Sequence, residues 1–271
     1  MKKYIVFAYV AIILSLVVSC NRDEEPTIDA NDKNSVTLKF ENFFNGQAMY
    51  GLSGVYTSSS SQKHQFSTLK YIVSDVILVK SDGTEVKYHY QNPDKGAYIV
   101  DQSEEAITHN FVLEEIPAGD YKQVKFGLGI SPDAFVLGQE KQALFWDKAK
   151  TNGMSWSWAS GYKFVNFEGT YSDALDKNFK IHIGNIGNPQ QSNTPDVYKV
   201  VTLDLPQAAK VRKVIAPKIH IMADINQFLS GKNKVVLSDD NAQTMHPSKA
   251  IVKETAENLS LMFSVDHVHN N

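Results

Sequence analysis

Residues 64–80 read HQFSTLKYIVSDVILVK, a stretch rich in β-branched and aromatic residues that ends at the turn signal Ser81-Asp82-Gly83. This composition between turn residues predicts a β-strand. Similar stretches recur along the chain, namely SVTLKFENF (35–43), GAYIVDQ (96–102), HNFVLEEI (109–116), GDYKQVKFGLGI (119–130), GYKFVNFEGTY (161–171), NFKIHIG (178–184), YKVVTLDLP (198–206) and RKVIAPKIHIMADI (212–225). Many short strands with intervening turns favour a mainly β, β-sandwich-like fold.

Helical patterns are few and short. They cover residues 138–150, 224–230 and 248–261, and the last has a roughly regular apolar stripe. No second linker and no repeat of 20–50 residues interrupts the remainder of the chain. We therefore expect one domain over residues 36–271, β-sandwich-like with a few short helices.

The N-terminus has the layout of a bacterial lipoprotein signal. Lys2 and Lys3 precede an apolar run at 4–18, and a small residue stands before Cys20, the chain's one cysteine. We expect residues 1–19 to be removed and Cys20 to be acylated. Acylation leaves no thiol for disulfides, thiolate metal sites or catalysis.

Residues 20–35 are polar and acidic, with too few apolar residues to fold, and predict a flexible tether. Loss of residues 1–19 removes two lysines and no acid, which moves the formal charge from −3 to −5. No basic run is present to neutralise a phosphate backbone, so we expect no nucleic-acid partner. The signal and tether indicate a lipid-anchored outer-membrane protein, facing the periplasm or displayed on the surface.

Several enzyme signatures are absent from the sequence. It contains no His-Glu-x-x-His, no Gly-x-Ser-x-Gly, no phosphate-binding Gly-rich loop and no paired cysteines. We expect a binding protein, not an enzyme.

Two of the three tryptophans lie close together in GMSWSWASGYKFVNFEG (153–169). In an extended segment Met154, Trp156 and Trp158 would share a face. Glu168 is the one carboxylate inside this aromatic block. Glu168 has two possible roles: it forms a structural hydrogen bond, or it orients an imidazole that binds a metal.

Four histidines are candidate metal ligands by strand parity. In FKIHI (179–183), His182 lies opposite the apolar face, and in KIHIMA (218–223), His220 shares a face with Met222. If residues 263–269 form a strand, His267 and His269 also share a face, and imidazole suits copper or zinc. A solvated surface or a frayed chain end would explain the same residues without a metal.

Several of these segments resemble the copper-binding MbnP-like family. The similarity includes Gly-Met-x-Trp-x-Trp-x-x-Gly-Tyr-Lys-Phe (153–164), Phe-Glu-Gly (167–169), Phe-x-x-His-x-Gly (179–184), His-Val-His (267–269), YIVSDV (71–76) and IPAGDYKQVKFGLGIS (116–131). The resemblance implies a β-rich periplasmic or surface protein that binds copper. In some relatives a tryptophan is oxidised to kynurenine by a di-haem, peroxidase-like partner enzyme, which makes Trp156 and Trp158 the aromatic residues to consider here.

On this basis we expect His182, His267 and His269 to converge near Trp156 or Trp158 and bind copper, with His220 as a further candidate. Sequestration or delivery suits such a closed site better than catalysis.

The alternative is a glycan-binding surface lipoprotein in which Trp156, Trp158 and Tyr162 stack on sugar rings. Burial distinguishes the two hypotheses. Exposed, coplanar rings with His182 distant from His267 favour sugar, whereas buried indoles beside converging imidazoles favour metal.

Overall fold

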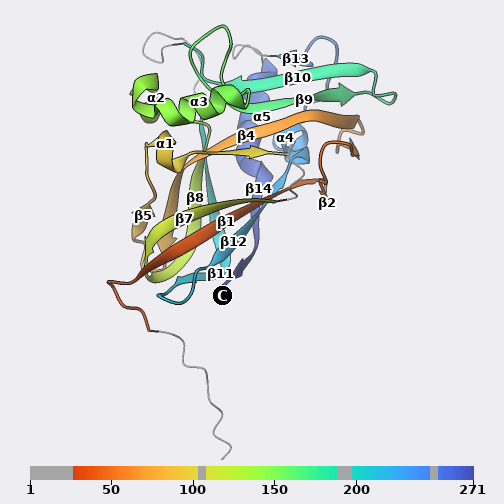
Figure 1. Cartoon of the computed structure of the whole chain (residues 1–271). Coiled ribbons are helices and arrows are strands. Elements are labelled where there is room, and N and C mark those ends of the chain that lie inside the picture. Colours follow the sequence, from red (N-terminus) through yellow and green to blue (C-terminus); the bar gives the residue numbers. More distant parts are fainter. Residues whose placement is uncertain (1–26, 103–107, 188–196, 245–249) are drawn as a thin grey trace, which may run out of the picture.

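The computed structural model describes residues 27–102, 108–187, 197–244 and 250–271. The predicted signal peptide, Cys20 and the first part of the predicted tether lie outside these residues. Two β-sheets face each other across a shared core, with short helices at the ends and sides (Figure 1). The mainly β, two-sheet fold expected from the strand patterns is confirmed. Within the described residues, no helix combines the length and apolar character needed to cross a membrane.

The smaller sheet contains five strands in the order β14-β12-β1-β2, with β7 also paired to β1. Their bounds are β1 Lys33–Phe44, β2 Gln47–Ala48, β7 Thr108–Pro117, β12 Lys218–Asp224 and β14 Phe263–His269. Strand β1 runs parallel to β12 and antiparallel to β7, and β14 runs antiparallel to β12. The chain's C-terminal strand is thus the outer neighbour of β12.

The larger sheet has the order β11-β8-β4-β9-β10-β13, and three short strands also pair with the long β4. The bounds are β3 Val55–Thr57, β4 Lys63–Lys80, β5 Glu85–Lys87, β6 Tyr98–Asp101, β8 Gly119–Leu128, β9 Lys163–Tyr171, β10 Lys177–Gly184, β11 Lys199–Val211 and β13 Gln243–Thr244.

The helices are short, as the sequence predicts. They are α1 Pro93–Gly96, α2 Pro132–Phe135, η1 Gln139–Gln142, α3 Ala143–Thr151, α4 Asn226–Ser230, α5 Ala250–Leu259 and η2 Ser260–Met262. The three predicted helical segments correspond to η1 with α3, to α4, and to α5 with η2. The two four-residue helices α1 and α2 were not predicted, because a proline-initiated single turn has no apolar periodicity to detect.

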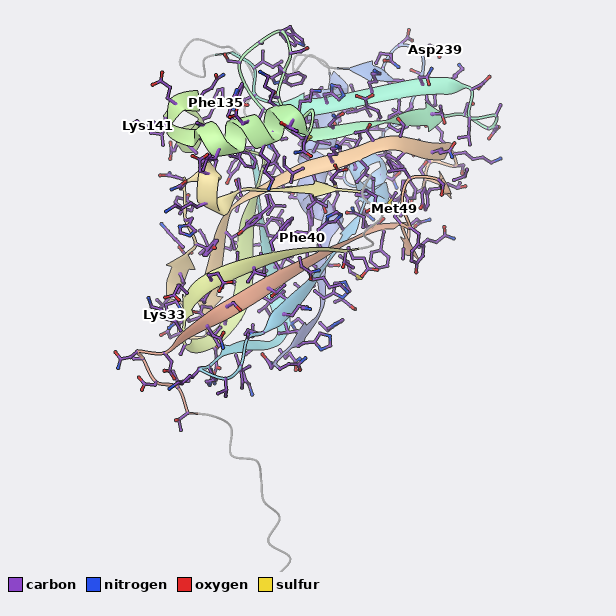
Figure 2. All side chains as sticks on the ribbon, in the orientation of Figure 1. Lys33, Phe40, Met49, Phe135, Lys141 and Asp239 are labelled. Atoms are coloured by element: carbon purple, nitrogen blue, oxygen red, sulfur yellow. The ribbon has the colours of Figure 1, made fainter. Side chains whose placement is uncertain are left out.

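Side chains fill the space between the two sheets, where Phe40 is labelled in Figure 2, and the buried core contains aromatic residues from both sheets. Phe40 of β1 packs edge-on against Phe126 of β8, with ring centroids 5.5 Å apart. Phe263, the first residue of β14, lies 5.2 Å from Phe126 and 6.3 Å from Phe40. Edge-to-face pairs at these separations add to the hydrophobic stabilisation of the buried rings. The three rings therefore tie β14 to both sheets.

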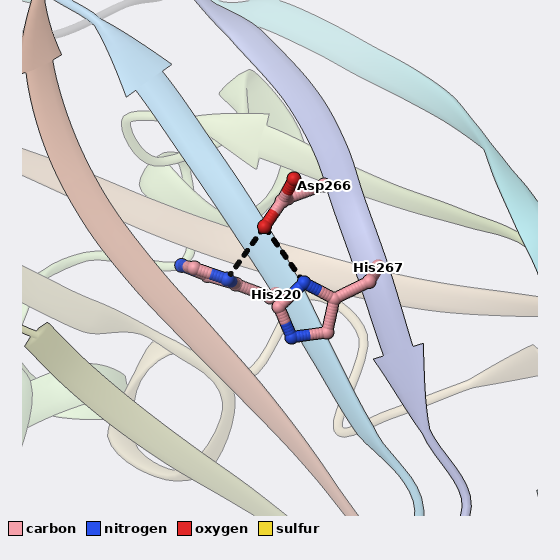
Figure 3. A group of neighbouring side chains, drawn as sticks. All are labelled: His220, Asp266 and His267. Atoms are coloured by element: carbon pink, nitrogen blue, oxygen red, sulfur yellow. Dashed lines mark hydrogen bonds and ion pairs between the residues drawn. The ribbon is translucent and has the colours of Figure 1, made fainter.

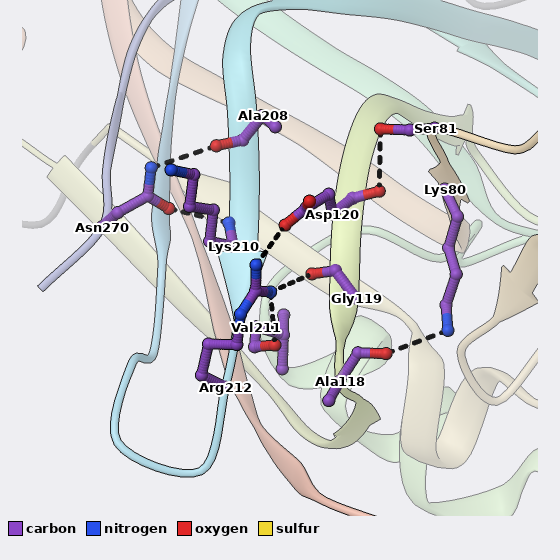
Figure 4. Close-up of polar contacts among 10 residues, drawn as sticks. All are labelled: Lys80, Ser81, Ala118, Gly119, Asp120, Ala208, Lys210, Val211, Arg212 and Asn270. Carbon is purple, nitrogen blue, oxygen red and sulfur yellow. Dashed lines mark hydrogen bonds and ion pairs between the residues drawn. The ribbon is translucent and has the colours of Figure 1, made fainter. Parts of the chain in front are cut away.

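The side chain of Asn270, which follows β14, is hydrogen-bonded to the backbone of β11 (Figure 4). The Asn270 amide donates to the carbonyl of Ala208 at 3.0 Å and its oxygen accepts from the Lys210 amide at 2.7 Å. At the same end of β11, the buried Arg212 guanidinium donates to Asp120 at 2.7 Å and to the Gly119 carbonyl at 3.1 Å. The C-terminal residues are consequently held in place.

His64 of β4 is fully buried between Phe44 and Phe179, and neither of its ring nitrogens has a hydrogen-bond partner. Burial penalises the charged imidazolium and lowers the pKa of His64 from 6.5 to about 4. Because the unfolded chain binds this proton more readily, folding stability due to His64 is present above pH 6.5 and is lost as the pH falls toward 4.

We expect the wild-type protein to lose up to about 3 kcal/mol more stability than His64→Leu between pH 7 and pH 4, since each pKa unit corresponds to about 1.4 kcal/mol. Urea unfolding at a series of pH values measures this difference. Carboxylates and other histidines titrate in both proteins, so the comparison isolates His64. Parallel pH profiles would show that the buried ring does not govern acid stability.

Candidate metal site

One row of side chains crosses the outer face of the smaller sheet. In β1, Leu38 and Phe40 point into the core, so Lys39 and Glu41 point outward. The strand register sets Lys39 directly opposite Asn110 of β7 on one side and His220 of β12 on the other. His220 in turn lies opposite His267 of β14.

A β-bulge in β14 brings a carboxylate to this row. His267 pairs with His220, but the next pair along the strands is Val265 with Ile221, which leaves Asp266 as the extra residue. A bulge interrupts the alternation of side chains and re-aims those beside it. Asp266 and His267 therefore both reach His220 despite being adjacent in sequence.

The Asp266 carboxylate lies between the two imidazoles (Figure 3). Its Oδ2 atom accepts from His267 Nδ1 at 2.7 Å and lies 3.3 Å from His220 Nδ1. Ligand atoms of His220, Asp266 and His267 fall within 4.8 Å of one another, the only such group of three histidine, cysteine or acidic residues in the described part of the chain.

Glu41 holds the other side of His220. Its Oε2 atom lies 2.8 Å from His220 Nε2, and because a carboxylate only accepts, Nε2 carries the hydrogen. The lone pair is then on Nδ1, which is buried and makes no hydrogen bond despite the 3.3 Å approach to Asp266. A carboxylate on one ring nitrogen with the other nitrogen free is how proteins commonly orient a metal-binding histidine.

Two effects keep His220 neutral. Burial, and after it the charge of Lys39, lower the pKa of His220, and the Glu41 carboxylate opposes them without reversing the shift. A neutral imidazole is the form that ligates metals.

His269 extends the cluster toward solvent. Its Nε2 lies 2.8 Å from His267 Nε2, and its strand partner is Lys218. With one nitrogen of each ring pointing at the other, one must donate and one accept. His267 is thus in contact with imidazole on one side and carboxylate on the other.

His182 occupies a second, separate environment in the larger sheet. Its Nε2 lies 2.9 Å from Glu168 Oε1, and Lys180 lies 3.3 Å from the other oxygen of that carboxylate. The ring centroid is 6.1 Å from Trp156, and Nδ1 is buried without a partner. Burial and the nearby Lys163 lower the pKa of His182, and Glu168 opposes them. Glu168 thus contacts an imidazole, a geometry that is compatible with both alternatives given for it, a structural hydrogen bond and the orientation of a ligand imidazole.

The tryptophan block is not an extended strand. Residues 157–161 form a bend, and an isolated bridge joins Ser155 to Tyr162. Trp156 is 5% exposed and donates to the Asn185 carbonyl at 2.6 Å, whereas Trp158 is 59% exposed. The expectation that Met154, Trp156 and Trp158 share one face is therefore wrong, because the bend turns Trp158 outward while Met154 remains buried.

The structure divides the predicted histidines between the two sheets. His220, His267 and His269 come together, but His182 lies in β10 of the larger sheet, and within the described residues it has no hydrogen bond, ion pair or ring contact with β14. The expected convergence of His182 with His267 and His269 is therefore corrected to two sites. The indole expected beside the metal accompanies His182 alone.

Two residues of the candidate site, Asp266 and Glu41, were missed from the sequence. Asp266 adjoins the His-Val-His motif, so a carboxylate next to paired imidazoles was a visible signal. Strand parity, however, places the Asp266 side chain on the face opposite His267. Only the bulge in β14 brings the two side chains to the same face. Glu41 offered no local signal. It is 179 residues from His220 and is brought there by the parallel pairing of β1 with β12.

The fold and this site define a two-sheet β-protein with a carboxylate-supported histidine cluster on one outer face. A family model described as MbnP matches residues 33–248, and the chain belongs to that family. Among solved structures, MbnP from Methylosinus trichosporium aligns with a TM-score of 0.54 and 14% identity, over 88% of this chain and 99% of that one, which shows a shared fold. No curated protein sequence matches the chain. The family match contains His182, His220 and Glu41 but ends before β14.

Glu168→Gln should lower the pKa of His182 further, because the carboxylate stabilises the imidazolium. Lys163→Met should raise it, because that change removes a neighbouring positive charge. Imidazole nitrogen chemical shifts followed against pH measure both. Shifts of the same sign in the two variants would contradict the arrangement of charges around His182.

Proposed function

We propose that this protein binds copper at the outer face of the smaller sheet, through His220 and His267 with Asp266 and His269 within reach. The observation that carries the proposal is the state of His220. Its Nε2 is held by Glu41, while its buried Nδ1 has no hydrogen bond and faces a carboxylate and a second imidazole. A buried polar atom without a partner is unfavourable unless a ligand satisfies it.

The donor set fits copper. It consists of imidazole nitrogens and a carboxylate oxygen, and the chain's one cysteine, Cys20, lies far away in the sequence. Nitrogen and oxygen sites bind Cu²⁺ more tightly than the other divalent first-row metals, and imidazole also suits Zn²⁺. Membership of the MbnP family, which the sequence resemblance associates with copper, favours copper over zinc.

The proposed role is sequestration or delivery. A cluster in which each imidazole already contacts a carboxylate or another imidazole offers a crowded set of ligands, whereas a catalytic metal keeps a position open for substrate. Copper is then the cargo of the protein.

The pair His182 and Trp156 remains a candidate for the aromatic chemistry that the resemblance implies. Trp156 lies against both His182 and the exposed Trp158, with a ring separation of 5.6 Å from the latter. Oxidation of one of these indoles by a di-haem partner enzyme is part of the proposal, and Trp158 is the ring accessible to such a partner.

The glycan hypothesis requires exposed aromatic rings, and two of the three proposed rings are buried. Tyr162 is fully buried and Trp156 is nearly so, and the two indoles are inclined by 48° instead of coplanar. Trp158 alone is exposed to stack on a sugar. We expected His182 to lie far from His267 in a sugar-binding protein. This separation does not favour sugar here, because His220 takes the place of His182 beside His267.

Copper affinity should fall by more than roughly 100-fold in the double variant His267→Gln/His269→Gln, and by roughly 10- to 100-fold in Glu41→Gln, which removes only the support of His220. Competition against a chromophoric chelator measures both. His89→Asn is the matched control, since His89 is exposed, lies outside the cluster and has a positive φ that asparagine tolerates. Unchanged affinity in the double variant would exclude this site, and a loss in His182→Gln instead would move copper to the larger sheet.

We also propose that Cys20 is lipidated and anchors the protein in the outer membrane. The sequence supports a lipid anchor, because it has a charged start, an apolar run and a small residue before the cysteine. Cells expressing Cys20→Ala should not label this protein with a clickable fatty acid and should release it from the membrane fraction. Equal labelling of the variant would refute the anchor.

A further inference from the structure

A polar depression of about 510 Å³ opens beside the two C-terminal histidines. Its walls come from four strands or their ends and include Lys39, Thr108, Asn110, Lys218, His267 and His269. The strand register explains this set. Asn110 and Lys39 lie in the same row as His220 and His267, and Lys218 is the direct partner of His269.

The residues that line the depression include two lysines but no aspartate or glutamate, while Glu41 and Asp266 contact the lining residues Lys39 and His267. The lysine, asparagine and threonine side chains of the lining carry N–H and O–H groups, and such groups bind oxyanions through hydrogen bonds, which are charge-assisted at lysine. The nearest acid to Lys39 is Glu41 at 3.5 Å, and that carboxylate is shared with His220. Lys218 has no ion-pair partner among the described residues.

The charge of a bound metal would strengthen the preference of this depression for an anion. The carboxylates of Asp266 and Glu41 supply two negative charges, which balance the two positive charges of Cu²⁺. Lys39 and Lys218 then leave an excess of positive charge next to the metal. Uncompensated charge in a partly desolvated site is costly, and a small anion next to the metal removes that cost.

We infer that this depression binds a small carboxylate-type anion, such as acetate or bicarbonate, held by Lys218 and Lys39 next to His267 and His269. A planar oxyanion matches several separated donors better than a spherical halide does. The part of the inference that sets this anion beside copper rests on the proposed function, while the anion site itself does not.

Acetate titrations at constant ionic strength, with perchlorate as the balancing ion and chloride as the comparison anion, test the inference. In the metal-free protein, saturable chemical-shift changes of the His267 and His269 imidazoles are the readout. In the Cu²⁺-loaded protein, the readout is a saturable change in the electron paramagnetic resonance spectrum. We expect both with acetate, and a weaker response with chloride.

Lys39→Met/Lys218→Met should raise the acetate midpoint by roughly fivefold or more, since each exposed ion pair contributes up to about a factor of five. Lys218→Met alone is the safer variant for folding because Lys218 is exposed, and Lys213→Met is the control for loss of one exposed lysine nearby. Equal midpoints in all variants, or no saturable response to acetate, would overturn the anion site even if copper binds normally. If copper fails to bind and the metal-free protein still responds to acetate in a lysine-dependent way, the copper proposal fails and the anion site stands.

Discussion

The contact among Phe40, Phe126 and Phe263 is the constraint on which the site depends. These rings come from β1, β8 and β14 and bury the inner faces of both sheets against each other. With Phe40 fixed inward, strand alternation sends Lys39 and Glu41 outward, and with Phe263 fixed, β14 stays on the edge of β12. A slip of one residue in either strand would bury the polar row and expose the aromatic rings. The hydrophobic core therefore sets the register, and the register assembles the histidine cluster.

The same device positions a histidine in each sheet. His220 has a glutamate two residues beyond its strand partner, Glu41 beyond Lys39, and His182 has Glu168 two residues beyond Asn166. In both pairs the carboxylate contacts Nε2, burial and a lysine lower the pKa of the imidazole, and Nδ1 has no hydrogen bond. Neutral, oriented imidazoles follow from this arrangement in two unrelated strand pairs, one antiparallel and one parallel.

Sequence patterns were sufficient for the fold class because alternation and turn residues are local signals. The strand at Phe263–His269 was a condition of the metal hypothesis, whereas the placement of His182 and His220 opposite the isoleucines of their strands follows from parity alone. The grouping of the histidines did not, since it requires knowing that β12 lies between β1 and β14 and that β10 lies in the other sheet. Asp266 was hidden for a different reason. A bulge changes parity at a single residue and leaves no periodic trace in the sequence. The bend after Trp156 was similarly invisible in a segment whose composition favours strand.

The two histidine environments differ in the groups that lie next to each imidazole. His220 faces Asp266 and His267, with His269 behind them, so a cation there would meet several ligands at once. His182 faces the indole of Trp156, and the second unpartnered buried atom on its row is the amide oxygen of Asn166, a weak ligand for a soft metal. A single imidazole with an amide oxygen binds copper poorly, yet a neutral, oriented imidazole beside a buried indole is well placed to influence that ring. The two tasks that we propose therefore fall to different sheets, metal binding to the smaller one and the chemistry of the Trp156–Trp158 pair to the larger one.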